Sequence, residues 1–215
     1  MKLDGIIFDI DGTIWDSREV VAKAWKAAFT ENTGYEFDHT PEEIGKLFGL
    51  PMTEIFERLL PELSSDELEA MLPTLYDYEH RYLRKYKPAP YETVRETFDE
   101  LSKEYPLFIV TNGQKGYAEA MLDATELYEY FTDWLSFGDT FTEKDQTLGK
   151  LIEKNGLKNT IYIGDTDGDY EAAKKNGLTF VFCSYGLGTL SEGNTPDYVI
   201  NNMSELKTVL KKIEE

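Results

Sequence analysis

The sequence predicts an α/β protein in which a parallel sheet carries helices on both faces and a small helical bundle follows the first strand. Two observations support this fold class. From about residue 91 onward, short apolar runs alternate with helical patterns, which is typical of repeated βα units. Residues 16–87, in contrast, show helical spacing and no convincing strand. We therefore expect a core domain at 1–15 and 88–215 and an α-helical cap domain at 16–87.

The first strand is expected at Ile6-Ile7-Phe8, because three apolar residues in a row indicate a strand buried on both faces. In the region that follows, Thr40 and Glu43 match a capping box, with Pro41 between them at the first helical position. Pro73 is a site where a long helix would kink or split. The expected helices of this region are 17–32, 41–48, 52–60 and 64–86.

The segment Lys87-Pro88-Ala89-Pro90 is expected to be a stiff return from the bundle, because each proline fixes its own backbone and extends the residue before it. Regular alternation follows. The expected helices are 91–104, 115–123, 145–155, 169–176 and 204–213, the last one capped by Ser204. The expected strands are 107–110, 134–137, 160–163, 179–182 and 197–200.

The charge of the chain excludes several classes of partner. There are 41 acidic and 22 basic residues, for a net charge of −19, and binding to nucleic acid or to an anionic membrane needs clustered Lys and Arg. Neither a signal peptide nor an apolar run approaching the roughly 18 residues of a membrane span is evident. We expect a cytoplasmic protein, a monomer or a homodimer, that acts on a small molecule.

Asp9 and Asp11 come directly after the first strand and are followed by Gly12 and Thr13. In open α/β sheets this carboxyl end of a strand is where ligands bind. Two carboxylates so close together would repel each other in a dry site unless a cation compensated them. The pair therefore predicts a metal site.

Polar residues also follow other predicted strands, and a parallel sheet would bring them to the same edge. Thr111-Asn112-Gly113 follows one apolar run, and Gly164-Asp165-Thr166-Asp167-Gly168-Asp169 follows another. Lys144 lies just before a predicted helix, where a lysine and free backbone N–H groups both favour an anion.

Taken in chain order, Asp9 and Asp11, Thr111, Lys144, and Asp165 with Asp169 resemble the four motifs of the haloacid dehalogenase (HAD) superfamily of phosphatases and phosphotransferases. The resemblance covers nearly the whole chain and implies a Rossmann-like core. A helical insert between the first two motifs is similar to the branch that contains phosphoglycolate phosphatases and β-phosphoglucomutases. The stretch Asp11-Gly12-Thr13-Ile14-Trp15-Asp16-Ser17 fits that branch closely.

The resemblance implies roles for the residues of the motifs. Asp9 would be the nucleophile that becomes an aspartyl phosphate, and Asp11 the general acid and base. Thr111, Lys144 and the backbone near Asn112 would bind the phosphoryl group. The expected cofactor, Mg²⁺, would be held by Asp9, Asp11 (through its backbone carbonyl), Asp165 and Asp169.

Two positions depart from the family pattern. The lysine motif often reads Lys-Pro, whereas here it is Lys144-Asp145, and Lys144 is preferred to Lys150 only because it precedes the predicted helix. Asp167 is a further carboxylate in the last motif, and the usual spacing ranks it below Asp165 and Asp169.

The leading hypothesis is a Mg²⁺-dependent phosphatase of phosphoglycolate phosphatase type that hydrolyses a small phosphorylated metabolite. The first alternative is a phosphosugar mutase of β-phosphoglucomutase type, which would use the same nucleophile. A non-catalytic binding protein on the same scaffold is less favoured, because all four motifs are intact. We also expect one cation of the cap to contact substrate, from the set Arg18, Lys46, Arg58, Arg81 and Arg84.

Overall fold

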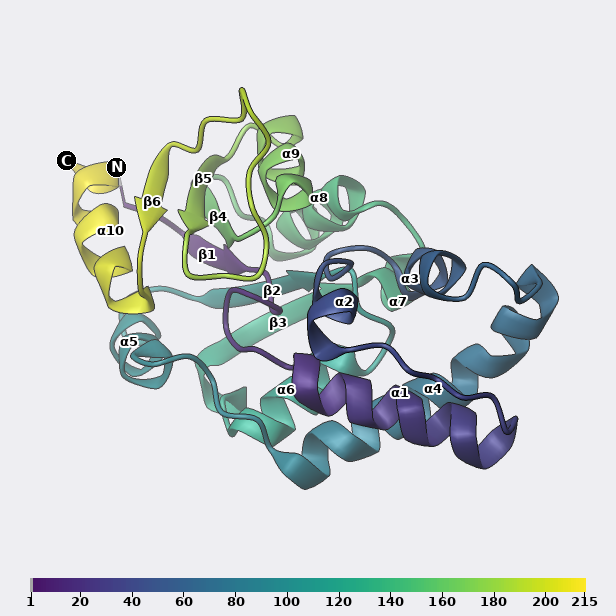
Figure 1. Cartoon of the computed structure of the whole chain (residues 1–215). Helices are drawn as coiled ribbons and strands as arrows, with labels where there is room; N and C mark the ends of the chain where they lie inside the picture. Colours follow the sequence, from purple (N-terminus) through teal and green to yellow (C-terminus); the bar gives the residue numbers. More distant parts are fainter. Residues whose placement is uncertain (1) are drawn as a thin grey trace.

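A six-stranded parallel sheet with the strand order β3-β2-β1-β4-β5-β6 forms the centre of the computed structural model, which describes residues 2–215 (Figure 1). The predicted α/β fold class is confirmed. Because β1 pairs with both β2 and β4, the residues that follow these three strands meet at one edge of the sheet. The strands are β1 (Gly5–Phe8), β2 (Leu107–Thr111), β3 (Phe131–Ser136), β4 (Thr160–Gly164), β5 (Thr179–Cys183) and β6 (Tyr198–Ile200).

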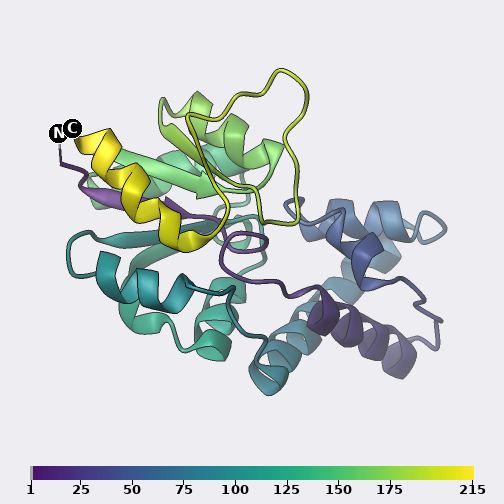
Figure 2. The same cartoon turned by 60° about the vertical axis from the view of Figure 1, so that its left-hand side comes forward.

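Both faces of the sheet are covered, as the apolar first strand predicts. Ile6 and Phe8 belong to one apolar cluster and Ile7 to another, because successive side chains of a strand point to opposite faces. Helices α8 and α9 pack on the Ile7 face, and α5, α6 and α10 lie on the other side of the sheet (Figure 2). The bounds of these helices are α5 (Val94–Leu101), α6 (Tyr117–Thr125), α8 (Lys144–Asn155), α9 (Asp167–Lys175) and α10 (Leu206–Glu214).

Four helices and no strand occupy the part of the chain from residue 16 to residue 87, all of which is described. They lie at one side of the molecule, away from both termini (Figure 1). Trp25, Phe29, Phe37 and Phe56 form an aromatic core among them. The helices are α1 (Arg18–Asn32), α2 (Pro41–Gly45), α3 (Met52–Leu59) and α4 (Ser65–Tyr86).

The two connections between this region and the sheet run side by side. Trp15 forms an antiparallel bridge with Pro90, and the backbone N–H of Tyr91 donates a hydrogen bond of 2.9 Å to the carbonyl of Ile14. The chain therefore enters and leaves the helical region at one place, the paired joint, where Trp15 and the proline-rich return lie side by side.

Most helix starts follow their sequence signals. Thr40 and Glu43 form the predicted capping box, and Ser64 and Glu67 form a second one at the start of α4. Helix α4 continues through Pro73 without a break. Pro73 has no N–H to donate to the carbonyl of Glu69, one turn earlier. Glu69 is exposed, so water can satisfy that carbonyl.

Several predicted boundaries are wrong. Helix α5 begins at Val94 instead of residue 91. Ser204 does not cap the last helix; it lies in a short 3-10 turn, where the Asn202 side chain accepts its backbone N–H. Lys144 is the first residue of α8 and does not precede the helix, whose N-terminal cap is Glu143. A short helix, α7 (Phe137–Thr140), replaces the predicted end of the third strand.

None of the helices in the described range 2–215 is long and apolar enough to cross a membrane.

We predict that Ser64→Ala lowers the free energy of unfolding by about 1 kcal/mol, because it removes the side-chain acceptor for the backbone N–H of Glu67. Ser65→Ala, at the next and equally exposed position, is the matched control and should change stability by less than about 0.5 kcal/mol. Urea denaturation followed by circular dichroism measures both values. Equal destabilisation by the two changes would contradict the capping role.

Candidate active site

Buried polar side chains meet at the carboxyl edge of the three central strands. Asp9 follows β1, Thr111 ends β2, Asp165 follows β4, and Lys144 begins α8. Their exposed fractions are 4%, 3%, 1% and 5%, and Asp169 is fully buried. Burying this many charged groups is costly unless they compensate one another or a ligand compensates them. The structure thus brings these sequence-predicted residues into one site.

Three carboxylates of this site form a cluster around one lysine. Oxygen atoms of Asp9, Asp165 and Asp169 all lie within 4.8 Å of one another. The ammonium of Lys144 lies 2.6 Å from Oδ1 of Asp9 and 2.6 Å from Oδ1 of Asp169. One lysine cannot neutralise three carboxylates, so the cluster keeps an excess of negative charge.

The pKa values of the cluster reflect this excess. Burial raises the pKa of Asp9 well above its ordinary value, an effect that Lys144 opposes and that Asp169 and Asp165 reinforce. Burial and the neighbouring Asp169 raise the pKa of Asp165 to about 7. The charge of Asp169 and Asp9 raises the pKa of Lys144 despite its burial, so the lysine stays charged. A divalent cation would remove the remaining repulsion.

One oxygen of Asp165 lacks a hydrogen-bond partner inside the cluster. Its Oδ1 atom is buried and has no hydrogen-bond partner among residues 2–215, whereas Oδ2 accepts the backbone N–H groups of Leu187 and Gly188, both at 2.8 Å. Gly12, with φ of 77°, lets the chain pass this carboxylate, because a Cβ atom there would lie 2.0 Å from Oδ2. A buried carboxylate oxygen without a donor is a suitable ligand for a hard cation such as Mg²⁺.

Asp169 has fewer free acceptor positions than Asp165. Its Oδ2 accepts the backbone N–H groups of Asp165 and Thr166 and the Thr166 hydroxyl, and its Oδ1 is near Lys144 and accepts the hydroxyl of Tyr162 at 3.0 Å. Asp169 therefore offers fewer free lone pairs to a cation than Asp165 does.

Asp11 points away from the cluster, and its Oδ1 collects three donors. These are the indole Nε1 of Trp15 at 3.0 Å, the Ser17 hydroxyl at 2.7 Å and the Tyr117 hydroxyl at 2.7 Å. Burial raises the pKa of Asp11, and the hydrogen bonds, that of Tyr117 first, limit the rise. No hydrogen bond from any described residue reaches Oδ2, so this oxygen is available to a ligand.

The side chains of Thr111 and Asn112 serve different neighbours. Thr111 lines a cavity together with Asp9 and Asp11. Its hydroxyl accepts the backbone N–H of Gly113 at 3.1 Å. The Asn112 side chain donates to the carbonyl of Gly49, 2.6 Å away in the loop between α2 and α3. Asn112 therefore ties the sheet edge to the helical region through its side chain.

The structure separates Asp167 from the cluster. Its carboxylate accepts the backbone N–H of Ser191 at 2.8 Å and the Asn194 amide at 2.7 Å, and these hydrogen bonds lower its pKa although partial burial acts in the opposite direction. Asp167 thus fixes the loop after β5, whereas Asp165, two residues earlier, faces the cluster.

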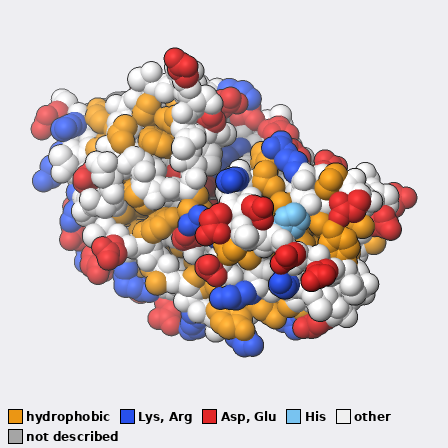
Figure 3. Space-filling view, viewed as in Figure 1, with side chains coloured by type: hydrophobic (Ala, Val, Ile, Leu, Met, Phe, Trp, Pro, Cys, Tyr) orange, Lys and Arg blue, Asp and Glu red, His pale blue; other side chains and the backbone are white. Residues whose placement is uncertain are grey.

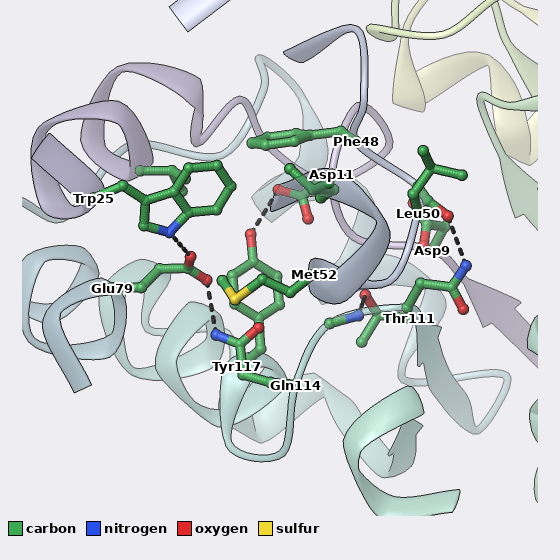
Figure 4. A pocket seen from close by; sticks show the side chains of 15 residues that line it. Asp9, Asp11, Trp25, Phe48, Leu50, Met52, Glu79, Thr111, Gln114 and Tyr117 are labelled. Atoms are coloured by element: carbon green, nitrogen blue, oxygen red, sulfur yellow. Dashed lines mark hydrogen bonds between the residues drawn. The ribbon is translucent and has the colours of Figure 1, made fainter. Parts of the chain in front are cut away.

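Several residues of the site carried little sequence signal. Ser17, Tyr117 and Tyr162 were missed, as were Glu79 and Gln114, which lie where α4 faces α6 (Figure 4). Tyr162 had one weak signal: a phenol in an otherwise apolar buried strand needs a partner for its hydroxyl. The others are brought together only by the packing of the helices.

Four of the five cap cations form ion pairs at the surface. Arg18 pairs with Asp16, Arg58 with Glu54, Arg81 with Asp77 and Arg84 with Asp123. Lys46 instead lines a hollow that it shares with Asp11 and Asp165. In the space-filling view, Lys and Arg side chains lie around a hollow near the middle of the molecule (Figure 3).

Comparison with known proteins gives one consistent result. Residues 6–183 match the model of the haloacid dehalogenase-like hydrolases. The chain is 30% identical over 220 residues to the phosphoglycolate phosphatase of Vibrio vulnificus, covering 95% of each protein. It is 26% identical over 220 residues to the pyrophosphatase PpaX of Bacillus mycoides, covering 99% of each protein.

Solved structures share the fold. A haloacid dehalogenase-like family hydrolase from Streptococcus pneumoniae superposes with a TM-score of 0.80 at 22% identity, over 96% of this chain and 98% of that one. CbbY from Rhodobacter sphaeroides, solved in complex with phosphate, gives a TM-score of 0.80 at 18% identity, over 95% and 96% of the two chains.

We predict that Asp165→Asn weakens Mg²⁺ binding by about tenfold or more, because the orphaned carboxylate oxygen loses its charge. Asp167→Asn is the matched control, since its carboxylate is held by Ser191 and Asn194 outside the cluster, and it should leave the affinity within about twofold. Isothermal titration calorimetry without substrate measures both.

The same titration should depend on pH. Below about pH 7 the raised pKa of Asp165 places a proton on the carboxyl that the metal must displace, so Mg²⁺ affinity should fall as the pH drops from 8 to 6. Affinity that is independent of pH, or equal losses in the two variants, would contradict the assignment.

Proposed function

This chain belongs to the haloacid dehalogenase-like hydrolase family and is a phosphatase, and we propose that it uses Mg²⁺ to hydrolyse a small phosphorylated metabolite through an aspartyl phosphate on Asp9. The observation that carries this proposal is the buried cluster in which Asp9 faces Lys144, Asp165 and Asp169. Four motifs from distant parts of the sequence meet there.

In the first step, a carboxylate oxygen of Asp9 attacks phosphorus, and the bond between phosphorus and the ester oxygen breaks. The leaving alkoxide takes a proton from Asp11, whose raised pKa favours the protonated form that this step needs. Asp11 can do this without disturbing the cluster, because its carboxyl is anchored separately by Trp15, Ser17 and Tyr117.

In the second step, the deprotonated Asp11 takes a proton from a water molecule, whose oxygen attacks phosphorus and releases Asp9 and inorganic phosphate. Lys144 and Thr111 bind the phosphoryl oxygens as their charge grows, and both are already buried in position. Asp9, Asp165 and the Asp11 carbonyl would hold Mg²⁺, with Asp169 orienting its ligands, and the bound ion would supply positive charge to the same oxygens.

We propose that residues 16–87 form a cap that keeps bulk water out of the site and leaves the single water molecule of the second step. The paired joint at Trp15 and Pro90 and the hydrogen bond from Asn112 to Gly49 support this role. The names of the relatives make phosphoglycolate and pyrophosphate the first substrates to test. Release of free phosphate, as opposed to isomerisation of a sugar phosphate, separates this proposal from a mutase.

We predict that Asp9→Asn lowers kcat for a generic aryl phosphate by about 10⁴-fold or more, since the nucleophile is lost. The chain offers Asp167→Asn as the matched control, which should keep most of the activity because Asp167 lies outside the cluster. Phosphate release with and without Mg²⁺ measures the effect, and acid quenching should trap phosphoenzyme in the control only. Activity that survives Asp9→Asn, or that needs no metal, would contradict the mechanism.

Tyr117→Phe tests Tyr117 as a positioning residue for Asp11. Loss of its hydroxyl removes a donor that lowers the pKa of Asp11, so we expect that pKa to rise further and the limb of the kcat pH profile that follows Asp11 to move to higher pH. We also expect kcat to fall about tenfold with little change in KM. Tyr128→Phe, at an exposed tyrosine, is the control. A loss of activity without a shifted pH profile would mean that Tyr117 is structural only.

A further inference from the structure

A cavity of about 50 Å³ extends from the catalytic carboxylates to the helical region. Since about 10–15 Å³ of such space holds one water molecule, the cavity has room for only a few small groups. Asp9, Asp11 and Thr111 line one end, where the phosphoryl group is bound in the proposed function. The other end is therefore where the leaving group lies.

The far end of this cavity is mostly apolar. Val21 and Trp25 of α1 and Met52 and Ile55 of α3 line it, and each is at most 7% exposed. Apolar walls pack against the carbon atoms of a ligand and provide no hydrogen-bond donor for a charged carboxylate or a second phosphate.

One buried carboxylate is the exception. Glu79 of α4 lines the cavity and is 3% exposed. It accepts the indole Nε1 of Trp25 at 2.6 Å on one oxygen and the Nε2 of Gln114 at 2.8 Å on the other (Figure 4). Two fixed donors orient the carboxylate, and each oxygen retains a second lone-pair direction for a ligand.

No cation offsets Glu79 within the cavity. Among the described residues that line it, none is Lys or Arg. No ion pair involving Glu79 is present among residues 2–215. Burial, with the charge of Asp11, raises the pKa of this carboxyl to about 7, so Glu79 is an anion above that pH. An anionic leaving group would meet this carboxylate at close range in a medium of low polarity, which is unfavourable.

Lys46 could attract an anion, but it does not line this cavity. It lines the neighbouring hollow together with Phe48, Asp165 and Gly188, and that hollow does not include Glu79. The two spaces can be told apart by experiment, because Glu79 lines only the cavity and Lys46 lines only the neighbouring hollow.

We propose that Glu79 selects the leaving group: the substrate is the phosphate ester of a small, non-anionic alcohol whose hydroxyl or ammonium group donates a hydrogen bond to the Glu79 carboxylate. This inference rests on the proposed phosphatase function and narrows its substrate class. It sets this chain apart from relatives whose names denote anionic substrates, phosphoglycolate and pyrophosphate.

The test compares leaving groups of similar size and different charge. Initial rates of phosphate release, with saturating Mg²⁺, are measured for 2-hydroxyethyl phosphate, phosphoethanolamine, phosphoglycolate and pyrophosphate. We expect kcat/KM for at least one of the first two to exceed that for both anionic compounds by tenfold or more. The better of the first two identifies the donor as hydroxyl or ammonium. An anionic compound that equals or exceeds them overturns the proposal.

Two variants then test the role of Glu79. Glu79→Gln keeps the shape and should reduce the preference for the non-anionic ester over phosphoglycolate at least fivefold. Met52→Lys places a cation in the same cavity and should raise kcat/KM for phosphoglycolate, which keeps the test informative should Glu79→Gln fold poorly. A preference unchanged in every folded variant overturns the assignment to Glu79.

A control on the neighbouring hollow and an independent substrate complete the design. Lys46→Met should leave the order of the four esters as it is, and an anionic preference that disappears in this variant would place the leaving group beside Lys46 and overturn the proposal. Hydrolysis of an aryl phosphate that depends on Asp9 and Mg²⁺ shows that the catalytic function holds whatever the panel shows. Its absence would refute the proposed function itself.

Discussion

The contact of Lys144 with Asp9 and Asp169 is the interaction on which the rest of the site depends. Removing one partner of a buried charge pair is far more damaging than removing a surface pair, because the remaining charge stays buried without compensation. Here the lysine is shared, at 2.6 Å from each carboxylate, and only 5% exposed. The parallel sheet provides the rigid edge that holds β1, α8 and α9 at this spacing.

The sequence predicts the core better than it predicts the approach to it. Residues at the ends of buried strands are fixed by the sheet, so Asp9, Thr111 and Asp165 follow from finding the strands. Tyr117 is 106 residues from Asp11 and 100 from Ser17, and it meets both only through the packing of the helical region on the core, which no local pattern encodes. One error at a helix end has a local cause: Asn202 caps a 3-10 turn at Met203–Glu205, so Ser204 lies inside that turn and the last helix begins only at Leu206.

The two ends of the catalytic cavity have opposite electrostatic character. At the sheet edge Lys144 and a carboxylate cluster that could hold a cation favour phosphate. At the helical end an apolar wall surrounds one carboxylate, which is held by a tryptophan from α1 and a glutamine just before α6. The same hydrogen bonds join α1, α4 and the residue just before α6, so the carboxylate proposed to recognise the leaving group also links the helical region to the core.

The paired joint has a practical consequence for protein engineering. Trp15 and Ser17 lie where the chain enters the helical region, and both donate to the carboxylate of Asp11. A chimera that exchanges helical regions between relatives at residue 16 would keep Trp15 but replace Ser17. It would thus change the hydrogen bonds of Asp11, the proposed catalytic acid, while appearing to change only specificity. The hydrogen bonds of Asp11 and the bridge to Trp15 are kept if the exchanged segment begins after Ser17 and ends before Pro90.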